Sequence, residues 1–354
     1  MEDQHSKEGH VRNKSKLALT LVGTGALLLA SVAAVAAIPG YKGLEGKAAA
    51  TYPKPVIKSG FKCTIGFQNP LGANESLQYM QKGALAQAKA LKCKLIVLDD
   101  ALSVDKQVSN MQQLLAQKVK AIVFYPLDPK AMTPVLNQAK KAGVPVVAID
   151  SGFGNPKNPV TPGISAQVWQ GRDIMAFLQV QALVKVKPGA KVGLIGIGAP
   201  VPALKYLNAR ETFYAEKNGL TVLGTQDNAS DDVTGGEKAG NALIQRYADM
   251  DAVIAYNDPS GIGAVIAAKA SGKTLTVIGL NGTSDGIQAV KDGRLAATVQ
   301  GDSPGIGRET VKAAYLLATK TMGKVRLVIL PPRIVTKANV NSIPSWDAEI
   351  KAIK

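Results

Sequence analysis

Histidine is absent from the body of this 354-residue chain, because its only two histidines, His5 and His10, lie in the first ten residues. Imidazole is the usual general base for a serine nucleophile and a common ligand of zinc. The motif "GTSDG" at residues 282–286 matches Gly-x-Ser-x-Gly, but no histidine in the body can activate Ser284. We therefore expect no catalytic residue, no metal ion and no cofactor. The competing hydrolase hypothesis predicts a slow turnover that Ser284→Ala abolishes.

Cysteine is also scarce, since Cys63 and Cys93 are the only two. Two cysteines cannot form a cysteine-only zinc site, and none lies near the N-terminus to carry a lipid anchor. Each one opens an apolar run that we interpret as one of the first two strands of a parallel sheet. If those strands are neighbours, both cysteines lie at one edge of the sheet and can form a disulfide bond. The alternative is that both are small buried apolar residues.

Aromatic residues make up only 5% of the chain, although the formal net charge is +16. Lysines are scattered along the expected helices without interleaved aromatics or arginine clusters. This distribution is typical of a solvated protein surface, and it argues against nucleic-acid binding.

Residues 17–38 contain no charge at all, and they follow a segment that carries Lys7, Arg12, Lys14 and Lys16. Basic residues, then an apolar run, then small residues are typical of a secretory signal, with a cleavage motif at residues 34–36. The apolar run is also long enough to remain as a membrane anchor, so both outcomes stay open. Either one predicts an extracytoplasmic body.

From residue 61 the sequence alternates short β-rich runs with helical stretches, which indicates βαβ units and a parallel sheet. Three prolines within residues 155–163 cannot continue a helix, so we place a lobe boundary there. The alternation then restarts with a helix expected at residues 167–185. The predicted fold is α/β, with two doubly wound parallel-sheet lobes. In such a protein the ligand cleft lies between the lobes, at the carboxyl ends of the strands.

One strand-to-helix corner occurs twice, as "AIVFYPLDPKAMTPV" at residues 121–135 and "AVIAYNDPSGIGAV" at residues 252–265. In each corner an Asp-Pro pair follows a strand. We expect Asp128 and Asp258 to cap the helices, with the proline in the first helical position. The two corners would place Tyr125 and Asn257 on opposite walls of one cleft.

Three further stretches carry a family resemblance: "GVPVVAIDS" (143–151), "AVIAYNDPSGIGAVIAAKASGK" (252–273) and "TVIGLNGTSDGIQAVKDGRLAATVQ" (276–300). With them, the chain from residue 61 to about 340 resembles the type I periplasmic solute-binding proteins of ABC importers, specifically the ribose-binding-like group. The resemblance implies a monomer that closes on a small hydroxylated solute, a sugar or polyol, and delivers it to an ABC permease. The alternative role is a sensor that presents the closed form to a chemoreceptor or sensor kinase.

The resemblance also implies a three-strand hinge, which we map to residues 161–165, 299–303 and 330–333. The helix at residues 304–320 would return to the first lobe, and "RIVTKANV" would add a strand to the second. The resulting assignment is a signal peptide or membrane anchor at 1–38, a flexible linker at 39–60, an N-terminal lobe at 61–163 plus 304–329, and a C-terminal lobe at 164–303 plus 330–345.

The family pattern assigns ligand-binding roles to matching positions of this chain. Asp150 matches an acceptor of sugar hydroxyls, while Asn74 and Asn257 match amides that both donate and accept hydrogen bonds. The implied set is Asn74, Ser76, Tyr125, Asp150, Ser151, Arg210, Asn257, Asn281 and Gln300.

The chain departs from the family pattern at several of these positions. Where relatives commonly place ring-stacking aromatics, this chain has Ser76, Leu77 and Ser230. Ser151 stands where an arginine is usual, Asn281 replaces an aspartate, and Arg210 is offset by one residue. A smaller polyol, a modified sugar or another polar solute therefore fits as well as a simple sugar.

Overall fold

A computed structural model describes residues 38–153, 156–157 and 161–353, all of which fall in one unit of the chain that runs from residue 32 to 354. The predicted signal segment lies almost entirely outside the described residues. Within them, no helix is both long and apolar enough to cross a membrane.

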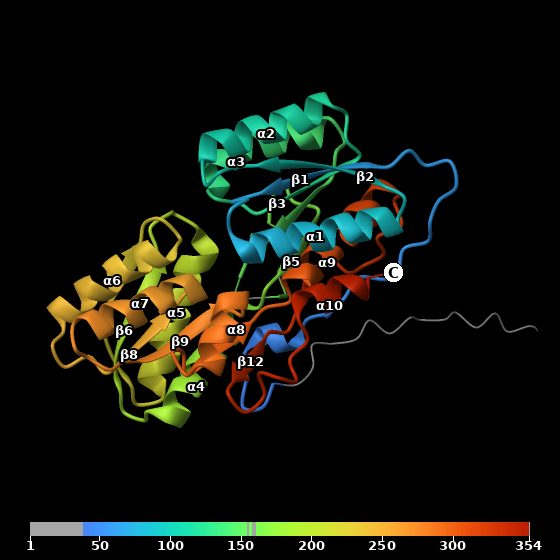
Figure 1. The fold of residues 1–354 in the computed structure, drawn as a ribbon. Helices are drawn as coiled ribbons and strands as arrows, with labels where there is room; N and C mark the ends of the chain where they lie inside the picture. Colours follow the sequence, from blue (N-terminus) through green and yellow to red (C-terminus); the bar gives the residue numbers. More distant parts are fainter. Residues whose placement is uncertain (1–37, 154–155, 158–160, 354) are drawn as a thin grey trace, which may run out of the picture. The chain divides into compact units, whose positions relative to one another are not determined.

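The first sheet has six parallel strands in the order β11-β5-β4-β3-β1-β2. Its central strands are continuously apolar and buried, as expected for a parallel sheet with helices on both faces. Helices α2 and α3 cover one face, while α1 and α9 cover the other (Figure 1). The strands are β1 (Thr64–Asn69), β2 (Lys94–Asp99), β3 (Ala121–Phe124), β4 (Val146–Ile149), β5 (Ala166–Trp169) and β11 (Leu327–Ile329), and the helices are α1 (Glu75–Ala90), α2 (Val104–Ala116), α3 (Pro129–Lys141) and α9 (Ser303–Ala318).

The second sheet repeats this plan in the order β12-β10-β9-β8-β6-β7, with β12 antiparallel at one edge. Helices α4 and α5 pack together, as do α6 and α7. The strands are β6 (Lys191–Ile197), β7 (Thr221–Asn228), β8 (Ala252–Ala255), β9 (Thr276–Asn281), β10 (Ala297–Gln300) and β12 (Arg333–Thr336), and the helices are α4 (Arg172–Val186), α5 (Pro202–Lys217), α6 (Val233–Arg246), α7 (Asp258–Ala270) and α8 (Ser284–Lys291). The last helix, α10 (Trp346–Lys351), packs against α1 and α9 of the first lobe. The prediction of two doubly wound parallel-sheet lobes is confirmed.

The expected start of the second lobe is wrong by several residues. We predicted a crossing at residues 161–165 and a helix at 167–185. Instead, β5 pairs with β4 and β11 of the first sheet, and α4 begins only at Arg172. The chain therefore crosses between the sheets after Trp169. The apolar run around residue 168 satisfies a helical pattern, but a short buried strand has no periodicity that distinguishes it. The other two crossings lie where predicted, between β10 and α9 and between β11 and β12.

Residues 39–60, predicted from their composition to be a flexible linker, contain ordered structure. They contain a short 3-10 helix, η1 (Leu44–Lys47), and Ala49 forms a bridge with β11. Tyr52 is 1% exposed, and its hydroxyl donates a hydrogen bond to the carbonyl of Gln167 at 2.5 Å. Composition could not predict this, because the partners of this segment lie more than 100 residues away.

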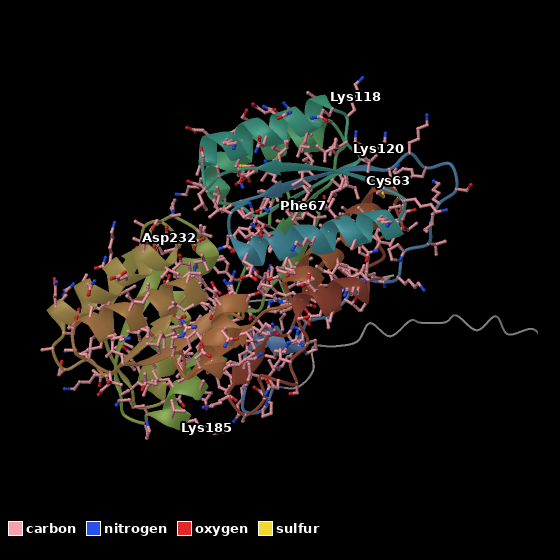
Figure 2. All side chains as sticks on the ribbon, viewed as in Figure 1. Cys63, Phe67, Lys118, Lys120, Lys185 and Asp232 are labelled. Atoms are coloured by element: carbon pink, nitrogen blue, oxygen red, sulfur yellow. A yellow bond between two sulfur atoms is a disulfide. The ribbon has the colours of Figure 1, made fainter. Side chains whose placement is uncertain are left out.

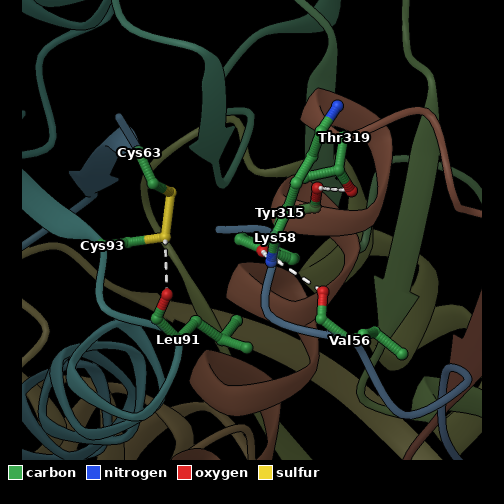
Figure 3. Close-up of a disulfide and its surroundings, with 7 residues drawn as sticks. All are labelled: Val56, Lys58, Cys63, Leu91, Cys93, Tyr315 and Thr319. Atoms are coloured by element: carbon green, nitrogen blue, oxygen red, sulfur yellow. Dashed lines mark hydrogen bonds between the residues drawn. A yellow bond between two sulfur atoms is a disulfide. The ribbon is translucent and has the colours of Figure 1, made fainter. Parts of the chain in front are cut away.

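Cys63 and Cys93 form a disulfide bond, which confirms the predicted pairing (Figure 3). Each cysteine immediately precedes its strand, and because β1 and β2 pair in parallel the two Cα atoms lie 4.6 Å apart. Nearby, the hydroxyl of Tyr315 on α9 accepts a hydrogen bond from the backbone N–H of Lys58.

The lysines lie mostly on exposed surfaces, as their scattered spacing predicted. Lys118, Lys120 and Lys185 extend outward from the ends of helices and loops (Figure 2).

Candidate functional site

A cavity of about 70 Å³, lined by both apolar and polar side chains, lies at the carboxyl ends of the strands of both sheets. Its polar lining comes mainly from residues that directly follow or end a strand, as the topology requires. The first sheet provides Tyr125 after β3 and Gln170 after β5, and the second provides Asn257 after β8. The full lining is Pro70, Asn74, Ser76, Leu77, Leu102, Tyr125, Leu127, Gln170, Arg172, Ile197, Val201, Leu204, Asp231, Tyr256, Asn257 and Asn281. We call this cavity the cleft.

Asn74 and Ser76 reach the cleft from the start of α1. Asn74 caps that helix, since its Oδ1 accepts a hydrogen bond from the N–H of Leu77 at 3.2 Å. Its Nδ2 donates a hydrogen bond to Asp231 Oδ2 of the second lobe at 2.9 Å. Ser76 is buried, and its Oγ lies 2.7 Å from the Oγ of Ser303. The Asn74 amide therefore has two roles, because its oxygen caps the helix and its nitrogen lies in the cleft.

Asp150 does not line the cleft directly but forms a buried ion pair at its base. Its Oδ2 accepts hydrogen bonds from Arg172 Nε at 2.9 Å and Gln170 Nε2 at 3.0 Å, and its Oδ1 accepts from the Gln170 N–H at 2.8 Å. The hydroxyl of Tyr125 lies 3.5 Å from the same carboxylate, and burial raises the pKa of this tyrosine above its usual range. Arg172, Gln170 and Tyr125 therefore lie between Asp150 and the cleft.

Asn257 caps α7 and faces the cleft at the same time. Its Oδ1 accepts from the N–H of Ser260 at 2.9 Å, while its Nδ2 donates to Asp231 Oδ1 at 2.7 Å and has a second N–H for a ligand. We had assigned the capping role to Asp258, and that assignment is wrong. Asp258 is fully buried behind the strands, where it accepts hydrogen bonds from the hydroxyls of Thr298 and Thr283. In the first lobe Asp128 does cap its helix, as predicted.

Burial raises the pKa of Asp258 to about 7, although hydrogen bonds from Thr298 and Thr283 lower it. Since the unfolded pKa is near 4, only the folded state holds this proton between about pH 4 and pH 7. The stabilisation of the folded state by this proton is fully present below pH 4 and is lost as the pH rises through 7. We expect Asp258→Asn to flatten the fall in unfolding free energy over this range by up to about 1.4 kcal/mol per pH unit.

The measurement is chemical denaturation of the wild type and the variant across that range. Asp285→Asn removes the same charge from the exposed side of α8 and serves as the control. Identical slopes for wild type and Asp258→Asn would show that Asp258 does not take up a proton on folding.

Besides Asp150, three more residues of the predicted set do not line the cleft. Ser151 lines a separate depression beside Thr161 and Pro126. Arg210 donates from its Nε to Asp173 Oδ1 at 2.5 Å, because it lies on the side of α5 that packs against α4. Gln300 accepts from Arg333 Nε at 2.9 Å, since β12 pairs beside it at the edge of the sheet.

Four polar or charged cleft residues were absent from the predicted set: Gln170, Arg172, Asp231 and Tyr256. Gln170 and Arg172 were missed because β5 was mistaken for part of a helix. Tyr256 directly precedes Asn257 in the repeated corner, so the corner could have identified it as a cleft residue. In the loop before α6 we had considered Ser230, whereas the neighbouring Asp231 lines the cleft. Asp231 has a positive φ of 57°, an unusual value for a residue with a side chain.

The polar part of this lining consists of hydrogen-bonding groups, and the rest is apolar. Among the described residues there is no group of three or more histidine, cysteine or acidic side chains placed to hold a metal ion. Ser284 lies outside the cleft, where its Oγ donates to Glu75 Oε1 at 2.6 Å. Amides, phenols and carboxylates converge instead, and these groups bind hydroxylated molecules.

Residues 65–322 match the family model described as a periplasmic binding protein domain. The ribose import binding protein of Bacillus subtilis (strain 168) is 31% identical over 252 residues, which cover 71% of this chain and 80% of that protein. The xylitol-binding protein of Mycolicibacterium smegmatis is 27% identical and covers 62% of each chain.

Solved structures share the fold. An ABC transporter solute-binding protein from Bacillus halodurans with bound myo-inositol has a TM-score of 0.71 at 24% identity, covering 80% of this chain and 98% of that one. Another from Mycobacterium smegmatis with bound glycerol has a TM-score of 0.72 at 24% identity, with the same coverage.

Proposed function

Because the chain belongs to the periplasmic binding protein family, we propose that it captures a small hydroxylated solute, a sugar or polyol, and delivers it to an ABC permease. The observation that carries this proposal is the cleft itself, where Asn74 from one lobe faces Asn257 and Asn281 from the other. Amides both donate and accept hydrogen bonds, as sugar hydroxyls do.

We propose that the two lobes close on the solute by bending at the crossings between the sheets. The lobes already touch beside the cleft, where the N–H and hydroxyl of Ser284 donate to Glu75. Closure excludes water, which strengthens each hydrogen bond to the solute.

The family supports an extracytoplasmic location. We propose that the segment at residues 1–38 directs export, and the disulfide bond fits an oxidising compartment. The named relatives bind ribose and xylitol, and the similar structures contain myo-inositol and glycerol. Since the family consists of binding proteins, the proposal requires no catalysis, no cofactor and no partner besides the solute and the permease. We propose that the protein acts as a monomer.

A thermal-shift screen of the purified protein against sugars and polyols tests this proposal. A ligand at 100 times its dissociation constant stabilises the folded state by about 2.7 kcal/mol, which gives a clear shift in Tm. Amino acids and nucleosides form the comparison panel. The proposed solute class would be overturned if no sugar or polyol raised the Tm while a compound of the comparison panel did.

Asn257→Ala should weaken binding of the solute by tenfold or more, about 1.4 kcal/mol, because the cleft loses a buried amide donor. Isothermal titration measures the change in Kd. Asn257→Ser keeps a capping oxygen but lacks the amide, so it should lose a similar factor. Asp128→Ala is the matched control, since it removes the equivalent cap from α3 without touching the cleft. An unchanged Kd in both Asn257 variants would remove this residue from the binding site.

A further inference from the structure

The cleft carries one negative charge that no protein cation balances. Among the described residues, Asp231 is the only acid in its lining and Arg172 the only base. Arg172 is already paired with Asp150 at 2.9 Å. No lysine or arginine nitrogen lies within 4.0 Å of the Asp231 carboxylate in the part of the chain that the structure describes. Arginine contributes one positive charge and the two aspartates two negative ones, so the site has a net charge of −1.

Three neutral donors hold this carboxylate in place. Its Oδ1 accepts from the Tyr256 hydroxyl at 2.5 Å and from Asn257 Nδ2 at 2.7 Å, and its Oδ2 accepts from Asn74 Nδ2 at 2.9 Å. A carboxylate offers about four acceptor positions, so one position on Oδ2 remains. Neutral donors orient the group, but they do not cancel its charge.

The backbone around Asp231 is also specialised. Its φ of 57° lies in the left-handed region, where a residue with a side chain is strained. The amide Oδ1 of Asn228 holds this conformation by accepting from the N–H groups of Ser230 and Asp231, each at 3.1 Å. A loop built in this way presents the carboxylate to the cleft at a cost in backbone energy, as functional positions often do.

Asp231 is half-buried, and the fully buried carboxyl groups differ from it in one of two respects. Asp173 and Glu309 have their own cations, Arg210 and Lys312. Glu45, Asp100, Glu211 and Asp258 are in no ion pair, but they are at most 1% exposed and none of them lines the cleft, so no ligand meets them. Asp231 alone combines a missing cation with access to the ligand space among the described residues.

We infer that the solute carries a basic amine as well as hydroxyls, as an amino sugar or amino polyol does, and that its ammonium group pairs with Asp231. This inference rests on the proposed function and narrows its substrate class. An ammonium supplies both the missing positive charge and a donor for the remaining acceptor position on Oδ2.

Matched pairs of ligands test the inference by isothermal titration at pH 7. The pairs are D-glucose with D-glucosamine, D-galactose with D-galactosamine, and glycerol with 2-amino-1,3-propanediol. In the wild type, the amino member of at least one pair should bind at least tenfold more tightly than the neutral one. Asp231→Asn should remove this preference, so that the two members of the pair bind within about threefold of each other, because the variant carries no charge to attract the ammonium group.

Asp232→Asn is the matched control (Figure 2). Asp232 lies next to Asp231 but is exposed and caps α6, and asparagine caps a helix equally well. This variant loses the same charge outside the cleft, so it should keep the preference for the amine.

The outcomes separate the two proposals. If neutral members bind as tightly as amino members in every pair that binds, the inference is wrong and the proposed function stands. If Asp231→Asn weakens both members equally, the inference is also wrong. If no member of any pair binds while a neutral sugar or polyol of the thermal-shift screen does, the inference is wrong and the proposed function stands. The comparison of ligands in the wild type holds even if a variant does not fold.

Discussion

Arg172→Met should destabilise the protein by about 3–5 kcal/mol, because it leaves the Asp150 carboxylate buried without a cation. The side chains of Arg172 and Asp150 are 7% and 2% exposed, so water cannot replace the lost partner. Since whole domains are stable by only about 5–15 kcal/mol, the effect should appear as a large drop in Tm. Chemical denaturation measures the change in unfolding free energy.

A double-mutant cycle separates the pair from its surroundings. Asp150→Asn keeps an acceptor for the Gln170 N–H but leaves Arg172 unpaired, so it should also be costly. The double variant should recover at least half of the loss, because it contains no unpaired buried charge. Additive losses in the double variant would mean that the two side chains act independently.

The Arg172 variant of this cycle should also affect solute binding. Arg172 lines the cleft and begins α4 directly after the first crossing, so its loss alters both the wall of the site and the connection between the lobes. We therefore expect Arg172→Met to weaken solute binding even under conditions in which the variant remains folded.

Removal of the disulfide bond should cost about 3–4 kcal/mol of stability without a change in solute affinity. The two cysteines are separated by 30 residues, and the loop-entropy model gives this magnitude for such a loop. The cysteines precede β1 and β2, whereas the cleft lies at the opposite, carboxyl ends of the strands. Six residues of extended strand, about 20 Å, lie between the two ends.

Cys63→Ala with Cys93→Ala should therefore lower Tm and leave Kd within about twofold of the wild type. Unfolding of the wild type with and without a reducing agent provides an independent measurement. The double variant is its control, since a reductant should not change a protein that lacks the bond. Equal stability of the oxidised and reduced wild type would contradict the prediction, and so would a weakened Kd in a folded double variant.

The sequence alone determined the architecture of this protein, because alternating apolar strands and helices leave few ways to bury both faces of a parallel sheet. The pairing of Cys63 with Cys93 could be predicted for the same reason, since two consecutive strands place both residues at one edge. The repeated corner also pointed correctly to Tyr125 and Asn257, because a residue that follows a parallel strand lies at the carboxyl edge of the sheet.

Other features of the protein depend on its tertiary structure. Residues 166–169 became a strand of the first sheet because β4 and β11 lie on either side, and nothing in four apolar-rich residues specifies those neighbours. Arg210 turned toward Asp173 because α5 packs on α4, and a one-residue shift along a helix rotates a side chain by about 100°.

The cleft is the clearest example of a feature that only the tertiary structure determines. Its charge depends on which carboxylates have a cation, and Asp150 acquires Arg172 whereas Asp231 acquires only neutral donors. These partners come from segments up to 157 residues apart. Local patterns record which residues follow a strand, but only the packing of both lobes decides which charges remain unpaired, because pairing depends on distances that sequence spacing does not contain.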